Sequence, residues 1–190
     1  MTMPMNLKDY LKIYNNEFDL DFCKNTVKKI KKNNWIKHTF YDYISDKTIQ
    51  YENELDISYD DSEENKIIQE KLWFLIKRYI EDNSFVASWY NAWSGYTKVR
   101  FNKYDKHTEM HLHCDHIHSM FDGQRKGIPT LSIVGCLNDN YTGGDFIMWE
   151  SEKIEIPAGS VIIFPSNFLY PHKVTPVTKG TRYSFVSWVW

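Results

Sequence analysis

Four of the seven histidines of this chain, together with one aspartate, lie within residues 111–118. In a β-strand the side chains alternate between two faces, so His111, His113 and Asp115 would project to the same side. An imidazole nitrogen and a carboxylate oxygen spaced in this way can bind one metal ion, and we expect His113 and Asp115 to provide them. His111 shares their face, and we expect it to lie beside the ligands without binding the metal.

A third metal ligand should come from a later strand, and His172 is the only histidine that follows His118. Two imidazoles and one carboxylate on one side of a metal leave the opposite positions open, which is the ligand set of non-haem iron(II) oxygenases. Two other interpretations stay open. The histidines could be exposed residues of a polar strand, and a zinc hydrolase would use the same ligands plus a nearby carboxylate base, which the spacing does not identify. A cupin site is excluded, because Ile117 and Ile162 stand where that pattern requires glutamate and histidine.

Arg182 lies ten residues after His172 and is the candidate for binding a co-substrate. The open metal positions of an oxygenase must accept a 2-oxo acid and dioxygen, and the far carboxylate of 2-oxoglutarate needs a cation such as the planar guanidinium. A strand, the turn TKGT and a returning strand fit this interval, which would bring Arg182 beside the metal. Ser184 shares its face and could donate a second hydrogen bond. Considered alone, Arg182 could equally be a surface arginine.

Two helices are expected before the histidine-rich segment. Apolar residues recur at helical spacing over about residues 21–32 and 63–81, and the first of these helices has lysines on its outer face. Asp61, three residues before Glu64, is the expected start signal of the second helix.

From residue 84 onward, short segments rich in β-branched and aromatic residues alternate with turn sequences such as WSGY, YTGG, PAGS and TKGT, which predicts strands. So many short strands favour a mainly β jelly roll with the two helices packed against one sheet. We expect a single domain over residues 1–190, in which 1–83 form a helical support and 84–190 the catalytic core. The expected strands lie near residues 85–92, 95–104, 108–115, 129–138, 145–150, 153–156, 160–165, 170–175 and 181–190.

The composition is that of an ordinary globular protein. Hydrophobic residues make up 42% of the chain, and 25 acidic against 23 basic residues give a formal charge of -2, so nothing suggests binding to nucleic acid or to a membrane. The three cysteines are widely spaced without a C-x-x-C pair, which favours a reducing compartment. Neither a membrane helix nor a signal peptide is visible, so we expect a cytoplasmic protein.

The carboxy-terminal half of the chain resembles the prolyl 4-hydroxylase-like iron(II)/2-oxoglutarate-dependent dioxygenases, including their bacterial and phage members. The resemblance runs through VRFNKYDKHTEMHLHCD, LSIVGCLNDNYTGGDFIMW and IPAGSVIIFPSNFLYPHKVTPVTKGTRYSFVSW, of which the last is the most specific. It implies a double-stranded β-helix in which His113, Asp115 and His172 bind iron. It also implies that Arg182 binds the distal carboxylate of 2-oxoglutarate.

The resemblance implies roles for two aromatic residues, although a tyrosine or tryptophan on a strand is more often part of a core. Tyr104, nine residues before His113, matches a tyrosine that hydrogen-bonds the co-substrate. Trp188 matches an aromatic residue that lines the pocket in some members of the family.

One position departs from the family pattern. Several eukaryotic members have a tyrosine just before the Leu-Asn pair that contacts the distal carboxylate, and Cys136 stands there in this chain. We expect Ser184 or Thr130 to assist Arg182 in its place.

The implied reaction consumes iron-bound dioxygen (O2) and 2-oxoglutarate and yields succinate, carbon dioxide and a hydroxylated substrate, with ascorbate as a supporting reductant. The implied substrate is a prolyl residue in a peptide or protein, because a free amino acid would need a second cation, for which Arg125 is the nearest guess.

The connection over residues 119–129 should lie beside the substrate, with Phe121, Arg125 and Lys126 as candidate contacts, although a solvated connection is the simpler interpretation. A hydroxylase of a free amino acid or small metabolite, and a metal-binding jelly roll without catalysis, stay open.

Overall fold

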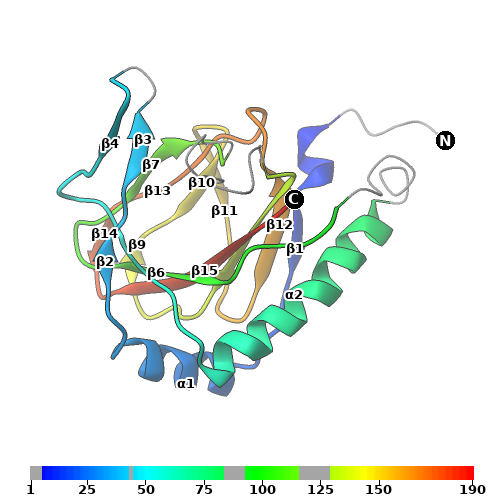
Figure 1. The fold of residues 1–190 in the computed structure, drawn as a ribbon, viewed down its shortest axis with the longest axis horizontal. Coiled ribbons are helices and arrows are strands. Elements are labelled where there is room, and N and C mark those ends of the chain that lie inside the picture. The colour runs from blue at the N-terminus through cyan, green and yellow to red at the C-terminus, as the bar shows by residue number, and fades with distance from the viewer. Residues whose placement is uncertain (1–5, 43–44, 84–92, 116–128) are drawn as a thin grey trace.

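The structure, a computed structural model, describes residues 6–42, 45–83, 93–115 and 129–190. A seven-stranded and a four-stranded antiparallel sheet pack against each other, and two α-helices lie outside the larger sheet (Figure 1). Two ribbons of two strands each complete the β-structure of the described residues. This architecture is the jelly roll that the strand pattern predicts.

The elements have the following order and bounds. The large sheet runs β1 (Lys12–Tyr14), β12 (Val161–Pro165), β8 (Leu131–Cys136), β15 (Arg182–Val189), β6 (Arg100–Tyr104), β5 (Asp56–Ser58) and β2 (Ile36–Lys37). The small sheet runs β11 (Glu152–Ile154), β10 (Phe146–Met148), β13 (His172–Val174) and β7 (Met110–His113). The ribbons pair β14 (Val177–Lys179) with β9 (Thr142–Gly143), and β3 (Phe40–Asp42) with β4 (Lys47–Ile49). The helices are a 3-10 turn, η1 (Leu7–Tyr10), and the α-helices α1 (Leu20–Ile30) and α2 (Glu63–Asp82).

Each α-helix begins at a side chain that caps it. At the start of α1, the Asp19 carboxylate accepts a hydrogen bond of 2.7 Å from the backbone N–H of Phe22. At the start of α2, the Ser62 hydroxyl accepts one of 3.2 Å from the N–H of Asn65. Such caps satisfy N–H groups that have no partner inside the helix. The expected start signal at Asp61 is therefore wrong by one residue, since that aspartate forms a surface ion pair instead.

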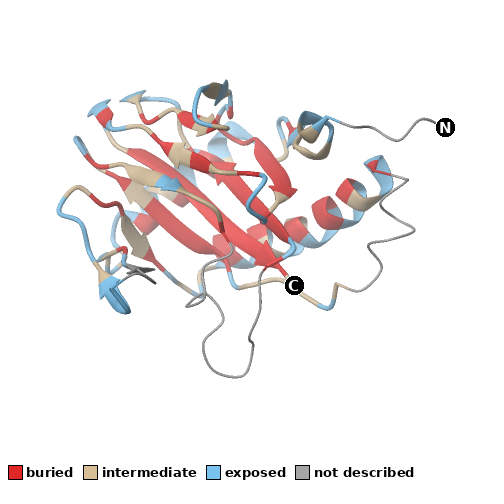
Figure 2. Cartoon of the chain, turned by 90° about the horizontal axis from the view of Figure 1, so that it is seen from above, coloured by how far each residue is buried: buried red, intermediate tan, exposed pale blue. Residues whose placement is uncertain are grey.

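The strands at the centre of the large sheet are buried on both faces (Figure 2). On the outer face, Tyr183 and Phe185 of β15 pack with apolar side chains of α1 and α2. On the inner face, Val186 and Trp188 of the same strand pack with side chains of the small sheet. Because side chains alternate along a strand, the even-numbered residues of β15, beginning with Arg182, point between the two sheets.

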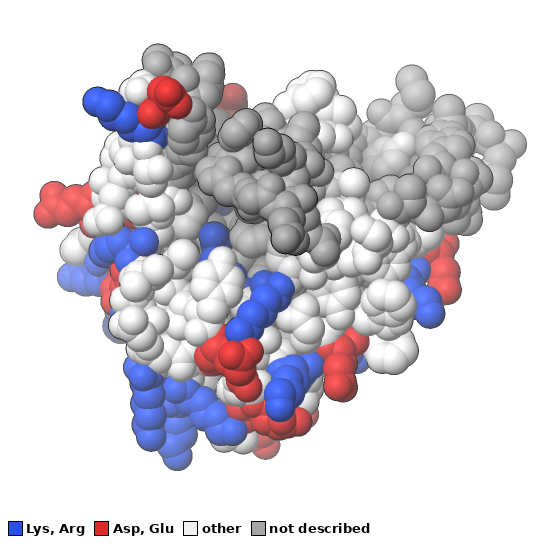
Figure 3. Space-filling model, viewed as in Figure 1, with Lys and Arg blue, Asp and Glu red and all other residues white. Residues whose placement is uncertain are grey.

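The surface around the helices is polar. Lys24, Lys28 and Lys29 of α1 are exposed, as the lysine spacing predicts, and Figure 3 shows basic side chains gathered at the lower edge of the molecule, where α1 lies in the same view. None of the helices in the described ranges combines the length and the apolar character that crossing a membrane requires. The cytoplasmic location stays a prediction.

The segment before residue 84 contributes strands as well as the helices that its sequence predicts. β1 pairs with β12, and β5 and β2 extend the opposite edge of the large sheet. These strands are only two or three residues long, too short for an alternation of polar and apolar residues to be visible. In the second half, the described strands lie within the predicted segments to within a residue, β9 and β14 are additional, and the expected strand over 85–92 lies outside the described residues.

Candidate active site

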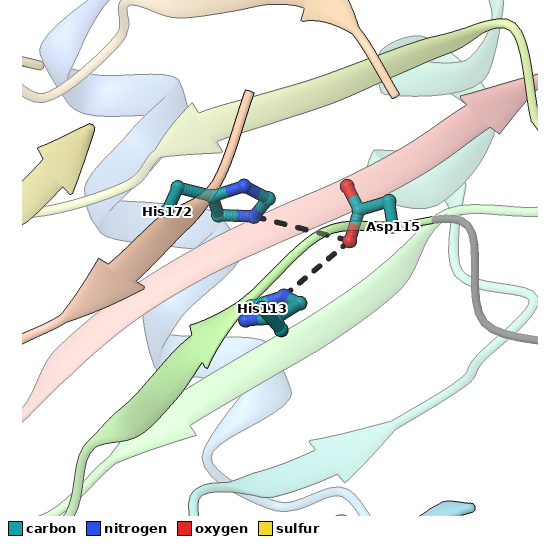
Figure 4. Close-up of side chains that lie close together, drawn as sticks. All are labelled: His113, Asp115 and His172. Atoms are coloured by element: carbon teal, nitrogen blue, oxygen red, sulfur yellow. Dashed lines mark ion pairs between the residues drawn. The ribbon is translucent and has the colours of Figure 1, made fainter. Parts of the chain in front are cut away.

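Three side chains of the metal-ligand type meet between the sheets (Figure 4). His113, the last residue of β7, lies opposite His172, the first residue of β13. Asp115 Oδ1 lies 3.4 Å from Nε2 of His113 and 3.8 Å from Nε2 of His172. The three ligand atoms all lie within 4.8 Å of one another, and no fourth histidine, cysteine, aspartate or glutamate of the described residues joins them. The group therefore has the size of a site for one metal ion.

Hydrogen bonds direct the same ring nitrogen of each histidine toward the aspartate. Nδ1 of His113 lies 2.7 Å from the carbonyl oxygen of His111. Nδ1 of His172 lies 3.1 Å from the carbonyl oxygen of Tyr170. A carbonyl oxygen only accepts, so Nδ1 of each ring carries a proton and the lone pair of a neutral ring is on Nε2. Two lone pairs and a carboxylate thus converge, and they fit a divalent metal held from one side.

Neighbouring side chains hold these ligands in place. The Ser132 hydroxyl donates a hydrogen bond to Asp115 Oδ2, which leaves Oδ1 toward the histidines. The ring of His172 stacks on Phe146 with 5.3 Å between ring centres and meets the edge of Phe164 at 5.1 Å. Ligands whose orientation is fixed in this way bind a metal more tightly than free side chains.

The protonation of the three groups suits metal binding. Burial lowers the pKa of His172 to about 4, and repulsion from His113 acts in the same direction, so this imidazole is neutral at neutral pH. Burial alone would raise the pKa of Asp115, but attraction to the two histidines and the hydrogen bonds it accepts hold it below its ordinary value. Burial would lower the pKa of His113, but Asp115 raises it overall.

A register shift removes His111 from this group. The pairing of β7 with β13 is irregular between Met110 and His113, as at a β-bulge. Met110 and His113 both line the site, whereas the His111 ring packs against Tyr51 with 4.8 Å between ring centres. The expectation that His111 shares the face of the ligands is wrong, although its carbonyl group does orient His113.

Arg182 is buried at the start of β15, with 2% of its surface exposed. Its Nη1 donates a hydrogen bond of 3.0 Å to Ser184 Oγ, so Ser184 shares its face as predicted. Its Cζ lies 4.9 Å from the ring centre of Tyr104, which is directly across on β6. Its Nε is buried without a hydrogen-bond partner among the described residues, and the groups that act on it most strongly are the side chains of Cys136, Tyr104 and Tyr141, none of which is a carboxyl group. Because an unpaired buried guanidinium is unfavourable, Arg182 is suited to bind an anion from outside the chain.

Tyr141 is a residue beside Arg182 that the sequence analysis misses. Its side chain is hydrogen-bonded to Arg182, and its hydroxyl oxygen lies 3.8 Å from Cys136 Sγ. Gly144, at a φ of +64°, permits this packing, because a Cβ there would come within 3.1 Å of Arg182 and 3.2 Å of Tyr141. The phenol of Tyr141 thus lies beside Cys136, which stands where several eukaryotic members of the family have their tyrosine. Thr130, expected as a partner, is instead exposed just before the opposite end of β8.

A single pocket contains the metal ligands and Arg182. Tyr104 and Trp188 also line it, as predicted, and Asp115 is the only carboxyl group in the lining that the structure describes. The general base that a zinc hydrolase would need therefore has no candidate there. Arg100 lines the pocket as well. Arg100 is thus a second cation of the described pocket lining, and the interpretation that Arg125 lies nearby stays a prediction, because Arg125 is outside the described residues.

Other predictions fall outside the described residues. Phe121, Arg125 and Lys126 belong to this group, and their contacts with a substrate stay predictions. The roles of Tyr104 and Trp188 toward a co-substrate also stay predictions, although the structure places both in the pocket.

The structure combines a jelly-roll fold, two histidines and one aspartate placed as for a metal ion, and a buried arginine in the same pocket. The sequence model of the 2OG-Fe(II) oxygenase superfamily matches residues 99–190. The matched segment, slightly less than half of the chain, contains every described residue that lines the pocket.

Several proteins of known sequence or structure are similar to this chain. A PKHD-type hydroxylase of Acinetobacter baumannii is 35% identical over 95 residues, which make up 47% of this chain and 41% of the relative. The match thus spans less than half of that protein. A Pseudomonas putida prolyl-4-hydroxylase has a TM-score of 0.65 over 95% of this chain and 91% of its own, at 16% identity. A Trichoplax adhaerens prolyl hydroxylase, in complex with a hypoxia inducible factor peptide fragment, has a TM-score of 0.69 over 96% and 84%, at 17% identity. These structures show that the fold is shared.

Proposed function

We propose that this protein is an iron(II)- and 2-oxoglutarate-dependent dioxygenase that hydroxylates prolyl residues in a peptide or protein. The observation that supports it most is the occurrence, in one pocket, of three convergent side chains of the metal-ligand type and a buried arginine that has no ion-pair partner among the described residues. A purely structural metal site is closed by its ligands and needs no such arginine. A metal-binding jelly roll without catalysis would therefore leave Arg182 unexplained.

Each part of the site has a defined task in the proposed reaction. Bound iron(II), 2-oxoglutarate and dioxygen together supply the oxidising power that breaks a C–H bond. His113, Asp115 and His172 would hold the metal ion. Arg182 binds the distal carboxylate of 2-oxoglutarate and so orients the co-substrate toward the metal. Tyr104, across from Arg182 on β6, offers its ring to the guanidinium and its hydroxyl to the co-substrate.

The prolyl assignment is supported by the pocket wall and by the relatives. Trp188 and Val186 line the pocket with apolar surface, against which a pyrrolidine ring can pack. Two structural neighbours are named as prolyl hydroxylases, and one of them holds a peptide. A free amino acid or small metabolite is the second candidate substrate. It is favoured by Arg100, a second buried cation in the same pocket.

Conversion of 2-oxoglutarate to succinate tests the dioxygenase assignment. With iron(II), ascorbate and dioxygen, the protein should form succinate slowly alone and faster with a peptide that it hydroxylates, and His113→Ala should form none. Proline-containing peptides and free amino acids are then screened by mass spectrometry for the gain of one oxygen atom. Absence of succinate under all these conditions would contradict the dioxygenase assignment. Oxidation of a free amino acid, with every peptide inert, would contradict the prolyl assignment alone.

A further inference from the structure

Arg100, the first residue of β6, is a buried cation in the pocket that neither the metal centre nor the proposed 2-oxoglutarate contacts use. We propose that its guanidinium binds a carboxylate of the substrate beside the metal, so that the substrate carries a negative charge close to the carbon that is hydroxylated. This inference rests on the proposed function, because it names the substrate class of the same site.

The contacts of Arg100 with the described residues leave part of its guanidinium without a partner. The residue is 8% exposed. Its Nε donates a hydrogen bond of 3.1 Å to Asn102 Oδ1, and its Cζ lies 4.9 Å from the ring centre of Trp188. No other hydrogen bond and no ion pair joins Arg100 to the residues that the structure describes. The Nη atoms are therefore available to a ligand in the pocket.

Nearby carboxyl groups do not neutralise this charge by direct contact. Asp115 and Glu54 both act electrostatically on Arg100, but Asp115 is engaged by two histidines and by Ser132. Glu54 Oε1 lies 3.8 Å from Nδ1 of His38. A buried guanidinium without a direct counter-ion lowers the stability of a fold. Its presence in the wall of a pocket is more typical of a binding residue than of a structural one.

The two buried arginines lie at different ends of the pocket wall. Arg182 is across from Tyr104, whereas Arg100 precedes Tyr104 by four residues, about 13 Å along the strand. A carboxylate held by Arg182 therefore leaves Arg100 for a different anionic group. Val186, directly across from Arg100, and Trp188, under its guanidinium, provide apolar surface for the carbon atoms of that molecule.

A carboxylate is the anion that best fits this site. The two terminal nitrogens of a guanidinium form parallel hydrogen bonds with the two oxygens of a carboxylate. Such a group can be the terminal carboxylate of a peptide or free amino acid, or the side chain of an aspartate or glutamate next to the reacting residue. The chemistry that Arg100 recognises is the same in each case.

Calorimetric titration of the protein loaded with manganese(II) and 2-oxoglutarate measures this preference without turnover. The probes are acetyl-Ala-Pro with a free terminal carboxylate, the same dipeptide with a terminal amide, acetyl-Pro-Asp with a terminal amide, and free proline. At least one carboxylate probe should bind about tenfold or more tightly than acetyl-Ala-Pro amide, because a hydrogen-bonded charge pair is lost in the amide. Whether the terminal acid or the aspartate probe binds best identifies the source of the carboxylate.

Three variants assign the preference to Arg100. Arg100→Met removes the charge, keeps an unbranched side chain, and should abolish the difference between the acid and amide probes. Arg100→Lys should retain part of it, because the ammonium lacks the planar fork. Lys98→Met removes the same charge from an exposed residue nearby and should change nothing. Manganese(II) and 2-oxoglutarate should bind all three variants as they bind the wild type.

The same measurements separate a binding role from a structural one. If Arg100 served only the fold, Arg100→Met would lower the melting temperature and weaken acid and amide probes alike. Under the proposal the melting temperature is unchanged or higher, because a desolvated charge is gone. Equal affinity of wild type for acid and amide probes, or no binding of any carboxylate probe at millimolar concentration, overturns the proposal. Failure of 2-oxoglutarate to bind the manganese-loaded protein would overturn the proposed function instead.

Discussion

Arg182 and Arg100 both line the pocket, and their burial and contacts are nearly the same. They are 2% and 8% exposed, and each lies 4.9 Å from the centre of an aromatic ring. Each donates a hydrogen bond to a side chain two residues further along its own strand, Ser184 at 3.0 Å and Asn102 at 3.1 Å. Neither forms an ion pair within the parts of the chain that the structure describes. The shared design favours two anion sites in one pocket.

The surroundings of the two arginines differ in one respect that separates their roles. Two phenols and a thiol act on Arg182. Two phenols also act on Arg100, but the carboxyl groups of Asp115 and Glu54 act on it as well. Asp115 is a metal ligand in our proposal. An anion bound by Arg100 would therefore interact with the metal centre more directly than an anion bound by Arg182. Both arginines are thus buried, but only Arg100 interacts electrostatically with a metal ligand. This difference distinguishes the proposed substrate site at Arg100 from the proposed 2-oxoglutarate site at Arg182.

Removal of a metal ligand should disable both sides of the pocket, and it is the largest effect that we expect. His113→Ala, Asp115→Ala or His172→Ala should each lower the affinity for iron(II) or manganese(II) by more than about a hundredfold and abolish succinate formation, since even residues that only support the ligands account for roughly 10- to 100-fold. His111→Ala is the control and should be mild. If His111→Ala abolished succinate formation and His113→Ala did not, the ligand assignment would be wrong.

Loss of Arg182 should affect the co-substrate alone. Arg182→Ala should raise the dissociation constant of 2-oxoglutarate by roughly 30-fold to several hundredfold, because a charge-assisted bidentate contact contributes about 2–4 kcal/mol. Metal affinity should stay the same, and Arg182→Lys should recover part of the binding. Titration of 2-oxoglutarate into the manganese-loaded protein measures both.

The matched control for this prediction is Arg100→Met, which should leave 2-oxoglutarate binding unchanged. If the two arginine variants weaken 2-oxoglutarate equally, then both residues hold one ligand, and the proposed division of the pocket is wrong.

The sequence predicts those parts of the site that follow from local geometry. The two-residue spacing of His113 and Asp115 sets both toward one metal, and the same spacing sets Ser184 beside Arg182. His172 is predictable because no other histidine follows residue 118. The jelly roll is predictable as well, because its strands after residue 128 are buried segments separated by turn sequences.

The rest of the site depends on contacts between distant segments. Arg100 looks like a surface residue in the sequence KVRFNKY, and it is buried only because β15 lies beside β6 and brings Trp188 under the guanidinium. Tyr141 reaches Arg182 only through the packing at Gly144. The register shift that turns His111 away from the ligands arises from the pairing of β7 with β13. None of these features has a local signal in the sequence.

Tyr141 tests how the co-substrate side compensates for Cys136. Tyr141→Phe should weaken 2-oxoglutarate binding by about two- to tenfold, the effect of one hydrogen bond of about 0.5–1.5 kcal/mol. Tyr183→Phe removes a phenol hydroxyl from the opposite face of β15 and should have no effect on this affinity. The measurement is again titration into the manganese-loaded protein. An unchanged affinity in Tyr141→Phe would mean that its hydroxyl does not assist Arg182.

Glu54 tests whether Arg100 is free of a counter-ion from the chain. Its side chain is fully buried, at 0% exposed, and burial raises its pKa from 4.5 to about 7. As the pH rises, the unfolded chain therefore releases this proton before the folded one. The contribution of Glu54 to stability is present below about pH 4.5, falls between pH 4.5 and about 7, and stays lost above that range.

Glu54→Gln preserves the shape of the side chain and removes its titration. Its melting temperature should be close to that of the wild type near pH 4.5 and should exceed it above about pH 7, by roughly 2–4 °C for each kcal/mol regained. Glu70→Gln, at an exposed position of α2, should differ from the wild type equally at both pH values. A lower melting temperature of Glu54→Gln above pH 7 would mean that ionised Glu54 is stabilised by nearby cations of the fold, which include His113, Lys37 and Arg100. The view that Arg100 has no counter-ion within the chain would then lose its support.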